Sequence, residues 1–344
     1  MSGIDLVAVQ PYMTLDDYVS PDAFSRKMES LCEKAAACRR GNDVPAVLVF
    51  PEDLATFLAL LGRGEAVAGA ATLDEAFVRI GRRLLGPLLG QMARYRTASL
   101  RRAFFLLQAP TVWRVWYDTF RALARRWRVW IVAGSALLPE NRLGWDTPFF
   151  RARDHRVYNL SVTFGPRGDV VNVTKKVNLV PTQEDVLDLT PGPLDEWTAF
   201  SVEGTLFANC ICYDAFRVPH TAGEPGFRCL LTEADARGVR VVLQPSANPW
   251  WWDEPWVFGS GADVPPRRRQ WEEEGAAAAL AGCRSVEVVV NAHLLARFLG
   301  VHFDGASAVH VRGEEGVRTV ARAGASRAEA ASETVVCYRF CRGD

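Results

Sequence analysis

The chain has 344 residues, enough for one large domain or two of ordinary size around a buried core. It contains 40 lysines and arginines and 40 aspartates and glutamates, so its formal net charge is zero. A chain without an overall basic field is not expected to have nucleic acid or an anionic membrane as its main partner.

The first elements predict an alternation of strand and helix. Apolar runs at residues 4–10 and 45–50 are typical of buried strands, and residues 21–40 between them repeat apolar side chains at helical spacing. Further strands are predicted at residues 127–135, 156–165, 170–176, 205–213, 239–247, 285–292, 306–313 and 333–340. The strands far outnumber the helices between them, so we expect an α/β fold with two sheets.

Residues 62–110 differ from the rest of the chain. They are rich in arginine, contain almost no acid after Glu75, and include a helical pattern that Pro87 interrupts. Residues 111–128 then carry a further helical stripe of apolar side chains. We interpret residues 62–110 as a helical insertion packed on the core, with arginine stems covering apolar surface. A lid, an oligomer contact and a membrane-surface patch are the alternatives.

The eight cysteines are scattered along the chain, unlike the dense spacing of a disulfide-stapled secreted module. We therefore expect reduced thiols and a cytoplasmic protein. Asp5 falls where a signal peptide would need an apolar core, and no run of about 18 uncharged apolar residues occurs. The sequence thus predicts no signal peptide and no integral membrane segment.

Three predicted strands end in reactive side chains: the first in Glu52, the second in Lys175 and Lys176, and the third in Cys210 and Cys212. Open α/β sheets form their sites at the carboxyl ends of strands. A thiol that attacks a carbonyl carbon needs a base to accept its proton, and the resulting oxyanion needs a cation or N–H donors. A carboxylate, a lysine and a cysteine supply this set.

Each of these groups also has an ordinary structural interpretation: a turn carboxylate, a solvated lysine pair and an apolar core cysteine. Cys210 and Cys212 would share one face of a strand, which raises a metal site as an alternative. No third and fourth ligand follow at a convincing spacing, so we expect no metal. The common dinucleotide, phosphate-loop, zinc-protease and serine-hydrolase motifs are absent, and we expect no cofactor.

The order of several short motifs is more specific than any one of them. They are VFPE (49–52), VAGS (132–135), YN (158–159), TKKVNLVP (174–181), CICYD (210–214), QPSANP (244–249) and FDGASAV (303–309). In this order the chain resembles the nitrilase superfamily of carbon-nitrogen hydrolases, and CYD is similar to its amidase and carbamoylase branches. The resemblance implies a single four-layer αββα sandwich over residues 1–344 and a homodimer or higher homo-oligomer.

The resemblance also implies roles for individual residues. Glu52 corresponds to the general base, Lys176 to the lysine that stabilises the oxyanion, and Cys212 to the nucleophile. Glu184 stands eight residues after Lys176, where family members often have a second glutamate, and would hold that lysine in place. Successive strand residues point to opposite faces, so only one lysine can face the cysteine. The motif selects Lys176 and leaves Lys175 in solvent.

Three further residues have less specific expectations. The backbone N–H of Tyr213 is expected to be a second oxyanion donor, a role open to any residue except proline. Asn248 is expected either to line the substrate pocket or to form an Asx turn. Asp214 is interpreted mainly as a structural residue that orients its turn. The stretch from Glu52 to Gly134 is longer than the family pattern, which leaves the substrate class open.

The leading hypothesis is a metal-free hydrolase that cleaves a non-peptide C–N bond of a small amide or carbamoyl compound through a cysteine thioester. One alternative is an acyltransferase of the same superfamily. Another is a non-catalytic binding protein that retains the fold. A papain-like pair of Cys212 with His220 or His293 is the last alternative.

Overall fold

The computed structural model describes residues 3–39, 41, 44–181, 183–256 and 264–341. Two six-stranded sheets form its centre. The first has the order β15-β1-β3-β4-β5-β6 and consists of β1 (Gly3–Gln10), β3 (Ala46–Phe50), β4 (Trp130–Asn141), β5 (Ala152–Phe164), β6 (Val170–Lys175) and β15 (Thr334–Cys341).

The second sheet has the order β14-β13-β10-β9-β8-β7. Its strands are β7 (Ala199–Val202), β8 (Thr205–Asn209), β9 (Val241–Ser246), β10 (Val288–His293), β13 (Ala308–Gly313) and β14 (Gly316–Arg322). A small third sheet joins β2 (Tyr12–Met13), β11 (Leu295–Phe298) and β12 (Val301–Phe303). Short 3-10 helices are η1 (Leu15–Tyr18), η2 (Thr56–Leu60), η3 (Leu194–Glu196), η4 (Cys212–Ala215) and η5 (Ala330–Ser332).

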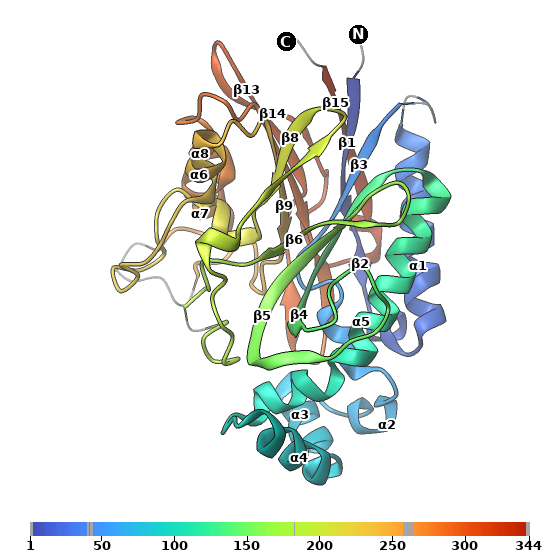
Figure 1. Cartoon of the computed structure of the whole chain (residues 1–344). Helices are drawn as coiled ribbons and strands as arrows, with labels where there is room; N and C mark the ends of the chain where they lie inside the picture. The colour runs from blue at the N-terminus through green and yellow to red at the C-terminus, as the bar shows by residue number, and fades with distance from the viewer. Residues whose placement is uncertain (1–2, 40, 42–43, 182, 257–263, 342–344) are drawn as a thin grey trace.

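Helices cover the outer faces of the two large sheets (Figure 1). The first sheet is covered by α1 (Pro21–Cys38) and α5 (Leu100–Trp127), and α6 (Leu230–Ala236), α7 (Arg267–Glu274) and α8 (Ala276–Leu280) lie outside the second. Ser20, Thr72 and Ser99 each begin a helix by accepting a hydrogen bond from the N–H three residues later. The predicted four-layer αββα sandwich is confirmed.

Alternation along the central strands builds three layers of core. In β1, Val7 and Val9 pack beneath the helices, whereas Leu6 and Ala8 pack against the second sheet. In β9, Val242 faces α6 and α8 while Val241 faces the first sheet. Each fully buried valine or leucine contributes about 1.5–3 kcal/mol relative to an exposed one. Strands buried on both faces read as continuous apolar runs, which explains why they were predictable.

All ten predicted strands overlap strands of the structure. Five strands were not predicted: β2, β7, β11, β12 and β14. The first four have only two to four residues, too few for a periodic pattern. The fifth, β14, is largely exposed and contains Arg318 and Arg322, so it lacks an apolar face.

The predicted insertion, residues 62–110, contains α2 (Gly64–Val67), α3 (Leu73–Arg83), α4 (Leu85–Tyr95) and the beginning of α5. The helical stripe predicted at residues 111–128 belongs to α5, which begins within residues 62–110 and continues through Pro110 as one 28-residue helix. A proline removes one helical hydrogen bond. Burial on both sides of it, at Phe105 and Ala109 before and at Val112 and Trp113 after, keeps the helix together.

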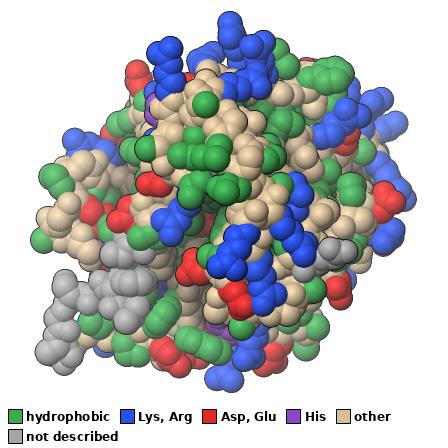
Figure 2. All heavy atoms as spheres, turned by 90° about the horizontal axis from the view of Figure 1, so that it is seen from below, with side chains coloured by type: hydrophobic (Ala, Val, Ile, Leu, Met, Phe, Trp, Pro, Cys, Tyr) green, Lys and Arg blue, Asp and Glu red, His purple; other side chains and the backbone are tan. Residues whose placement is uncertain are grey.

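The helices α3 and α4 form the lower end of the molecule (Figure 1). Val78, Leu85 and Leu89 are each more than half exposed there. The view from below shows hydrophobic and basic side chains side by side on this face (Figure 2). Within the described residues, no helix is both long enough and apolar enough to span a bilayer.

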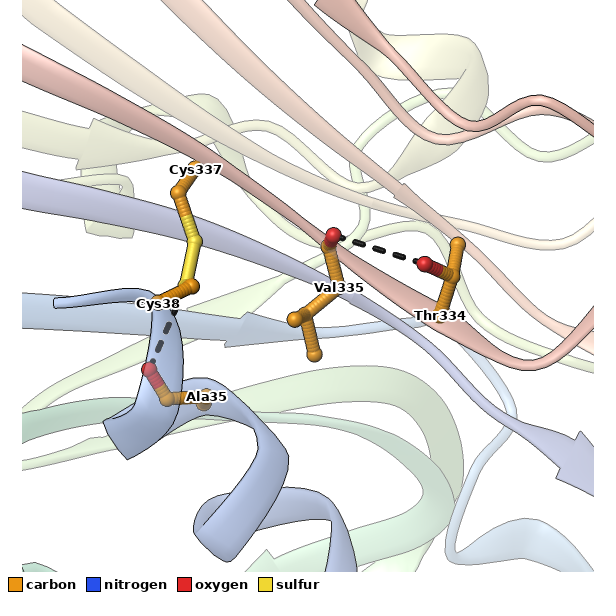
Figure 3. The surroundings of a disulfide bond; sticks show 5 residues. All are labelled: Ala35, Cys38, Thr334, Val335 and Cys337. Atoms are coloured by element: carbon orange, nitrogen blue, oxygen red, sulfur yellow. Dashed lines mark hydrogen bonds between the residues drawn. A yellow bond between two sulfur atoms is a disulfide. The ribbon is translucent and has the colours of Figure 1, made fainter.

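A disulfide joins Cys38, the last residue of α1, to Cys337 in β15 (Figure 3). Their Cα atoms are 6.5 Å apart, although 299 residues separate them in the sequence. The other six cysteines are free. The prediction of reduced thiols throughout is therefore wrong for this pair, because only the pairing of β15 with β1 brings its second cysteine to the helix end.

Candidate active site

Glu52 lies two residues beyond β3, in a turn that β4 holds in place. The backbone N–H of Asp53 donates a hydrogen bond to Ser135 Oγ at 2.8 Å. Gly134 has a φ of 75°, and a Cβ at this position would overlap the carbonyl oxygen of Pro51. The glycine and serine of the VAGS motif therefore let the two strand ends approach and set the direction of the Glu52 carboxylate.

The sequence predicted that Cys212 ends a strand, and this is not what the structure shows. The strand β8 stops at Asn209, and Cys212 begins η4 with a φ of 49°, in the left-handed region. A non-glycine residue keeps this conformation only where its surroundings hold it. Gln244 Nε2 donates to the Cys212 carbonyl oxygen at 2.9 Å, and Asn291 donates to the Gln244 side chain. The turn separates Cys212 from Cys210, which lies in the core beneath α6.

Lys176 is the first residue after β6, and its N–H bonds to the carbonyl oxygen of Asn159 at 2.8 Å. Its side chain is buried and points to the carboxylates of the site. Lys175 has other partners, with Nζ 2.5 Å from Glu196 and 3.4 Å from Glu140. The two lysines thus separate as predicted, but the Lys175 side chain is only 10% exposed and is paired rather than left in solvent.

Two carboxylates share one cation and one amide at the centre of the site. Lys176 Nζ donates to Glu52 Oε1 at 2.8 Å and to Glu184 Oε2 at 2.6 Å. Asn159 Nδ2 donates to Glu52 Oε1 at 2.8 Å and to Glu184 Oε1 at 3.0 Å. The Ala247 N–H donates to Glu52 Oε2 at 3.0 Å. These contacts satisfy the buried charges and fix the position of Glu52.

The Cys212 thiol is buried beside the Glu52 carboxylate. Cys212 Sγ donates to the carbonyl oxygen of Ala247 at 3.5 Å, and the Glu52 carboxylate interacts with the same thiol. Burial, with the negative charge of Glu52 as the second cause, raises the pKa of the Cys212 thiol well above its ordinary value. The cysteine is therefore protonated near neutral pH, and a thiol in this state needs a base before it can act as a nucleophile.

Burial also changes the two partners of the thiol. It raises the pKa of Glu52 above the ordinary value of 4.5, against the opposing effect of Lys176. Burial lowers the pKa of Lys176, but the negative charges of Glu184 and Glu52 outweigh it, and the pKa lies well above the ordinary value. The lysine is thus a permanent cation, and Glu52 is a stronger base than an exposed glutamate.

A cavity of about 200 Å³ opens onto Glu52, Lys176, Glu184 and Cys212. Most of the remaining wall is apolar and includes Phe57, Leu60, Leu73, Phe77, Phe104, Phe105, Leu137, Val180, Leu187, Val301 and Phe303. Four of these residues come from the α3 and α5 parts of residues 62–110. The predicted insertion therefore shapes the cavity.

Tyr213 directly follows Cys212, and its hydroxyl donates to Glu224 at 2.7 Å. Asn248 is not among the described residues that line the cavity. Its Nδ2 donates to the Trp250 carbonyl oxygen at 2.9 Å, and its Oδ1 accepts from Arg267 Nε at 2.9 Å. Because its Oδ1 accepts from Arg267 and not from a backbone N–H, Asn248 forms no Asx turn in these contacts, and among the described residues it reaches the cavity only through Arg267.

Asp214 holds the segment that follows the site lysine. It accepts hydrogen bonds from the N–H groups of Val177 and Asn178, at 3.1 and 2.7 Å, and from the Asn178 side chain at 3.0 Å. Burial raises the pKa of Asp214 to about 7. Its contacts are structural, as interpreted from the sequence, but they fix the loop after β6 rather than the turn of Asp214 itself.

The contacts of His220 and His293 do not support the papain-like alternative. His220 contacts the Gln270 side chain at 3.2 Å, and His293 packs on Trp271 with ring centres 4.6 Å apart. Burial lowers the pKa of both imidazoles, that of His293 to about 3. Neither histidine is among the described residues that line the cavity. Within the same described ranges, no group of three or more His, Cys, Asp or Glu side chains could hold a metal ion.

Sequence reasoning did not assign two residues of the site. Asn159 belongs to the YN dipeptide of a predicted strand, which was the available signal in the sequence. In the structure this strand, β5, pairs with β6, so that Asn159 lies beside the end of β6. Arg267 lies in the run of three arginines at 267–269 and lines the cavity near Cys212. Nothing in that run distinguishes its first arginine from the exposed pair that follows.

Comparisons with known proteins agree with this architecture. A family model for carbon-nitrogen hydrolases matches residues 92–254, a range that includes Lys176, Glu184 and Cys212 but not Glu52. A search of curated proteins found no significant match.

Two solved structures illustrate the likeness of the fold. A double mutant of the amidase from Nesterenkonia sp. AN1, in complex with acrylamide, is 14% identical with a TM-score of 0.56, and the match covers 100% of this chain and 93% of that one. Saccharomyces cerevisiae Nit3, a member of branch 10 of the nitrilase superfamily, is 18% identical with a TM-score of 0.56, and the match covers 99% and 91%.

Proposed function

We propose that the chain is a carbon-nitrogen hydrolase of the nitrilase type, to which its motifs and fold are similar, and that it hydrolyses a non-peptide C–N bond of a small amide or carbamoyl compound. Cys212 is the nucleophile, Glu52 the base and Lys176 the cation of this reaction. The observation that carries the proposal is the buried thiol beside Glu52, in one cavity with the Lys176–Glu184 pair. A cavity that holds a thiol, a base and a fixed cation can form and break down an acyl-enzyme.

The reaction begins when Glu52 accepts the thiol proton and Cys212 Sγ bonds to the carbonyl carbon. The negative charge that develops on the carbonyl oxygen is stabilised by Lys176 Nζ and by the N–H of Tyr213. Glu52 then returns the proton to the nitrogen, the C–N bond breaks, and the amine or ammonia leaves. A thioester on Cys212 remains.

Water then hydrolyses the thioester and completes the cycle. Glu52 takes a proton from the water as its oxygen attacks the thioester carbon, and the C–S bond breaks to release the acid. The proton then returns to the sulfur. Glu184 and Asn159 hold Lys176 and Glu52 in place throughout. Glu184 accepts a hydrogen bond from Lys176, and Asn159 donates to both Glu52 and Glu184.

A panel of amides, carbamoyl amino acids and nitriles tests the proposal. We expect ammonia release from at least one amide or carbamoyl compound, together with an acyl adduct on the peptide that contains Cys212 in rapidly quenched samples. Mass spectrometry and an ammonia assay measure the two products. Transfer of the acyl group to an added amine in preference to water would support the acyltransferase alternative. Binding without any adduct would support a non-catalytic protein.

The pH dependence of kcat/KM follows from the raised pKa of Glu52. Only the carboxylate form accepts the thiol proton, so activity falls as the pH drops through this pKa, at a higher pH than for an ordinary glutamate. Because Glu184 is one cause of the rise, Glu184→Gln is expected to move this acid limb to lower pH. The apparent value belongs to the coupled cluster. An acid limb at pH 4.5 or below in the wild type would contradict the assignment.

The setting of the enzyme is part of the same proposal. We propose a cytoplasmic setting because the nucleophile has to stay reduced and Cys212 is one of the six free cysteines, while Cys38 and Cys337 form the disulfide. Assembly as a homodimer or higher homo-oligomer remains a prediction from the family resemblance.

A further inference from the structure

Arg267 is a buried cation in the wall of the cavity. It begins α7, is 3% exposed and lines the same cavity as Cys212. Its Nε donates to Asn248 Oδ1 at 2.9 Å, and its Nη1 donates to the Gln270 side chain. Its Nη2 has no acceptor among the described residues. Both of its side-chain partners are neutral amides, so the guanidinium keeps its full charge.

No carboxylate forms an ion pair with Arg267 within the described part of the chain. Aromatic rings surround it instead: its Cζ lies 4.5 Å from the ring centre of Trp256, 5.8 Å from Trp271 and 5.9 Å from Phe216. Such faces attract a cation but do not neutralise it. Burial lowers the pKa of Arg267 to about 10, which shows that its surroundings disfavour the charge. A buried arginine without a carboxylate partner is stabilised when an anion binds to its guanidinium group.

The other ionised groups of the site already have partners. Lys176 is shared by Glu52 and Glu184, and neither carboxylate forms an ion pair with Arg267. Asp53, which also lines the cavity, accepts a hydrogen bond from Thr56, and burial raises its pKa to about 7. Among the described residues no carboxylate is left to pair with Arg267, so a ligand is the anion that the cavity can bring to it.

We propose that Arg267 binds a carboxylate of the substrate, so that the enzyme acts on amides or carbamoyl compounds that carry both a carboxylate and an apolar body. This inference rests on the proposed function for the reaction that the substrate undergoes. The binding of the carboxylate depends on Arg267, which has no part in that reaction. A single guanidinium with Nη2 free matches one monoanionic group. The apolar body faces the wall that Leu73, Phe77, Phe104 and Phe105 contribute.

Matched substrates test the inference. N-carbamoyl-phenylalanine is compared with 2-phenylethylurea, and adipamic acid with hexanamide, so that each pair differs mainly in the carboxylate. We expect kcat/KM to be about 100-fold higher for the acid of at least one pair, as for a site built around a polar group of its substrate. Arg267→Gln is expected to remove this preference while it changes the neutral member by about threefold or less. Arg267→Lys restores part of the preference.

Arg268→Gln is the matched control, because Arg268 is the next residue, is half exposed and pairs only with Asp253 among the described residues. It is expected to leave both members of each pair unchanged. Equal losses for acid and neutral substrates in Arg267→Gln would show a structural or chemical role and overturn the inference. A wild type without preference for either acid would also overturn it.

A binding measurement separates this inference from the proposed reaction. Calorimetry on the Cys212→Ala variant compares 3-phenylpropionate with 3-phenylpropanamide, with and without Arg267→Gln. We expect the carboxylate to bind about tenfold or more tightly only when Arg267 is present. If no amide acylates Cys212 but this difference is found, the proposed reaction fails and the anion site stands. If acylation occurs without the difference, the anion site fails alone.

Discussion

Replacing Cys212 with alanine is expected to abolish turnover, with a fall in kcat/KM of about 10,000-fold or more. No other thiol can substitute for it in the proposed reaction, because the nearest one along the chain, Cys210, is buried in the core beneath α6. The substitution removes only the sulfur. We therefore expect an unfolding temperature within a few degrees of the wild type.

The measurement is steady-state turnover of the best substrate in the panel, with mass spectrometry of the quenched protein. The acyl adduct is expected on the wild type and absent from the variant. Cys210→Ala serves as the control, since it removes a neighbouring buried thiol and leaves the cavity intact. We expect it to lower stability by about 1 kcal/mol and to keep activity within about twofold. Full turnover by Cys212→Ala would remove the cysteine from the mechanism.

The frame of the molecule was predictable because its strands are buried on both faces. Residues 4–10 and 45–50 read as uninterrupted apolar runs, and both faces of β1 and β3 contribute to core layers. These strands and β4 run in parallel. Because β5 is antiparallel to β4 and β6 is antiparallel to β5, β6 has the same direction as β4. Reactive residues that follow such strands meet at one edge, which explains why Glu52 and Lys176 could be paired from sequence.

The turn at Cys212 could not be predicted by the same reasoning. The letters of residues 205–213 continue a strand pattern, and the left-handed backbone at Cys212 depends on a hydrogen bond from Gln244 in the neighbouring strand. The role of Arg267 was hidden for a similar reason. Its burial follows from the aromatic side chains of distant segments, while the local run of arginines is typical of a solvated surface. Contacts between distant segments decide both features.

Replacing Lys176 with methionine is expected to lower kcat/KM by about 1,000-fold or more, as for the loss of an oxyanion-stabilising donor. The change also removes the cation that lowers the pKa of Glu52. Glu52 and Glu184 then face each other without a shared positive charge. The pKa of Glu52 rises further, so the acid limb of the residual activity is expected at a higher pH than in the wild type.

Lys175→Met is the matched control in the adjacent position. It removes the ion pairs with Glu196 and Glu140, outside the described wall of the cavity, and is expected to cost about 1–3 kcal/mol, between an exposed and a buried pair, while activity stays within about twofold. Thermal unfolding accompanies each assay, because loss of one partner from a buried ion pair costs about 3–5 kcal/mol.

Lys176→Arg keeps the positive charge but changes its geometry, and it separates folding from chemistry in the same assay. We expect this variant to recover most of the stability lost in Lys176→Met and little of the activity, because a planar guanidinium cannot place one donor where the ammonium stands. Equal activity losses in the Lys175 and Lys176 variants, with both proteins folded, would contradict the assignment of the inward lysine. A folded Lys176→Met protein with near wild-type turnover would remove the cation from the mechanism.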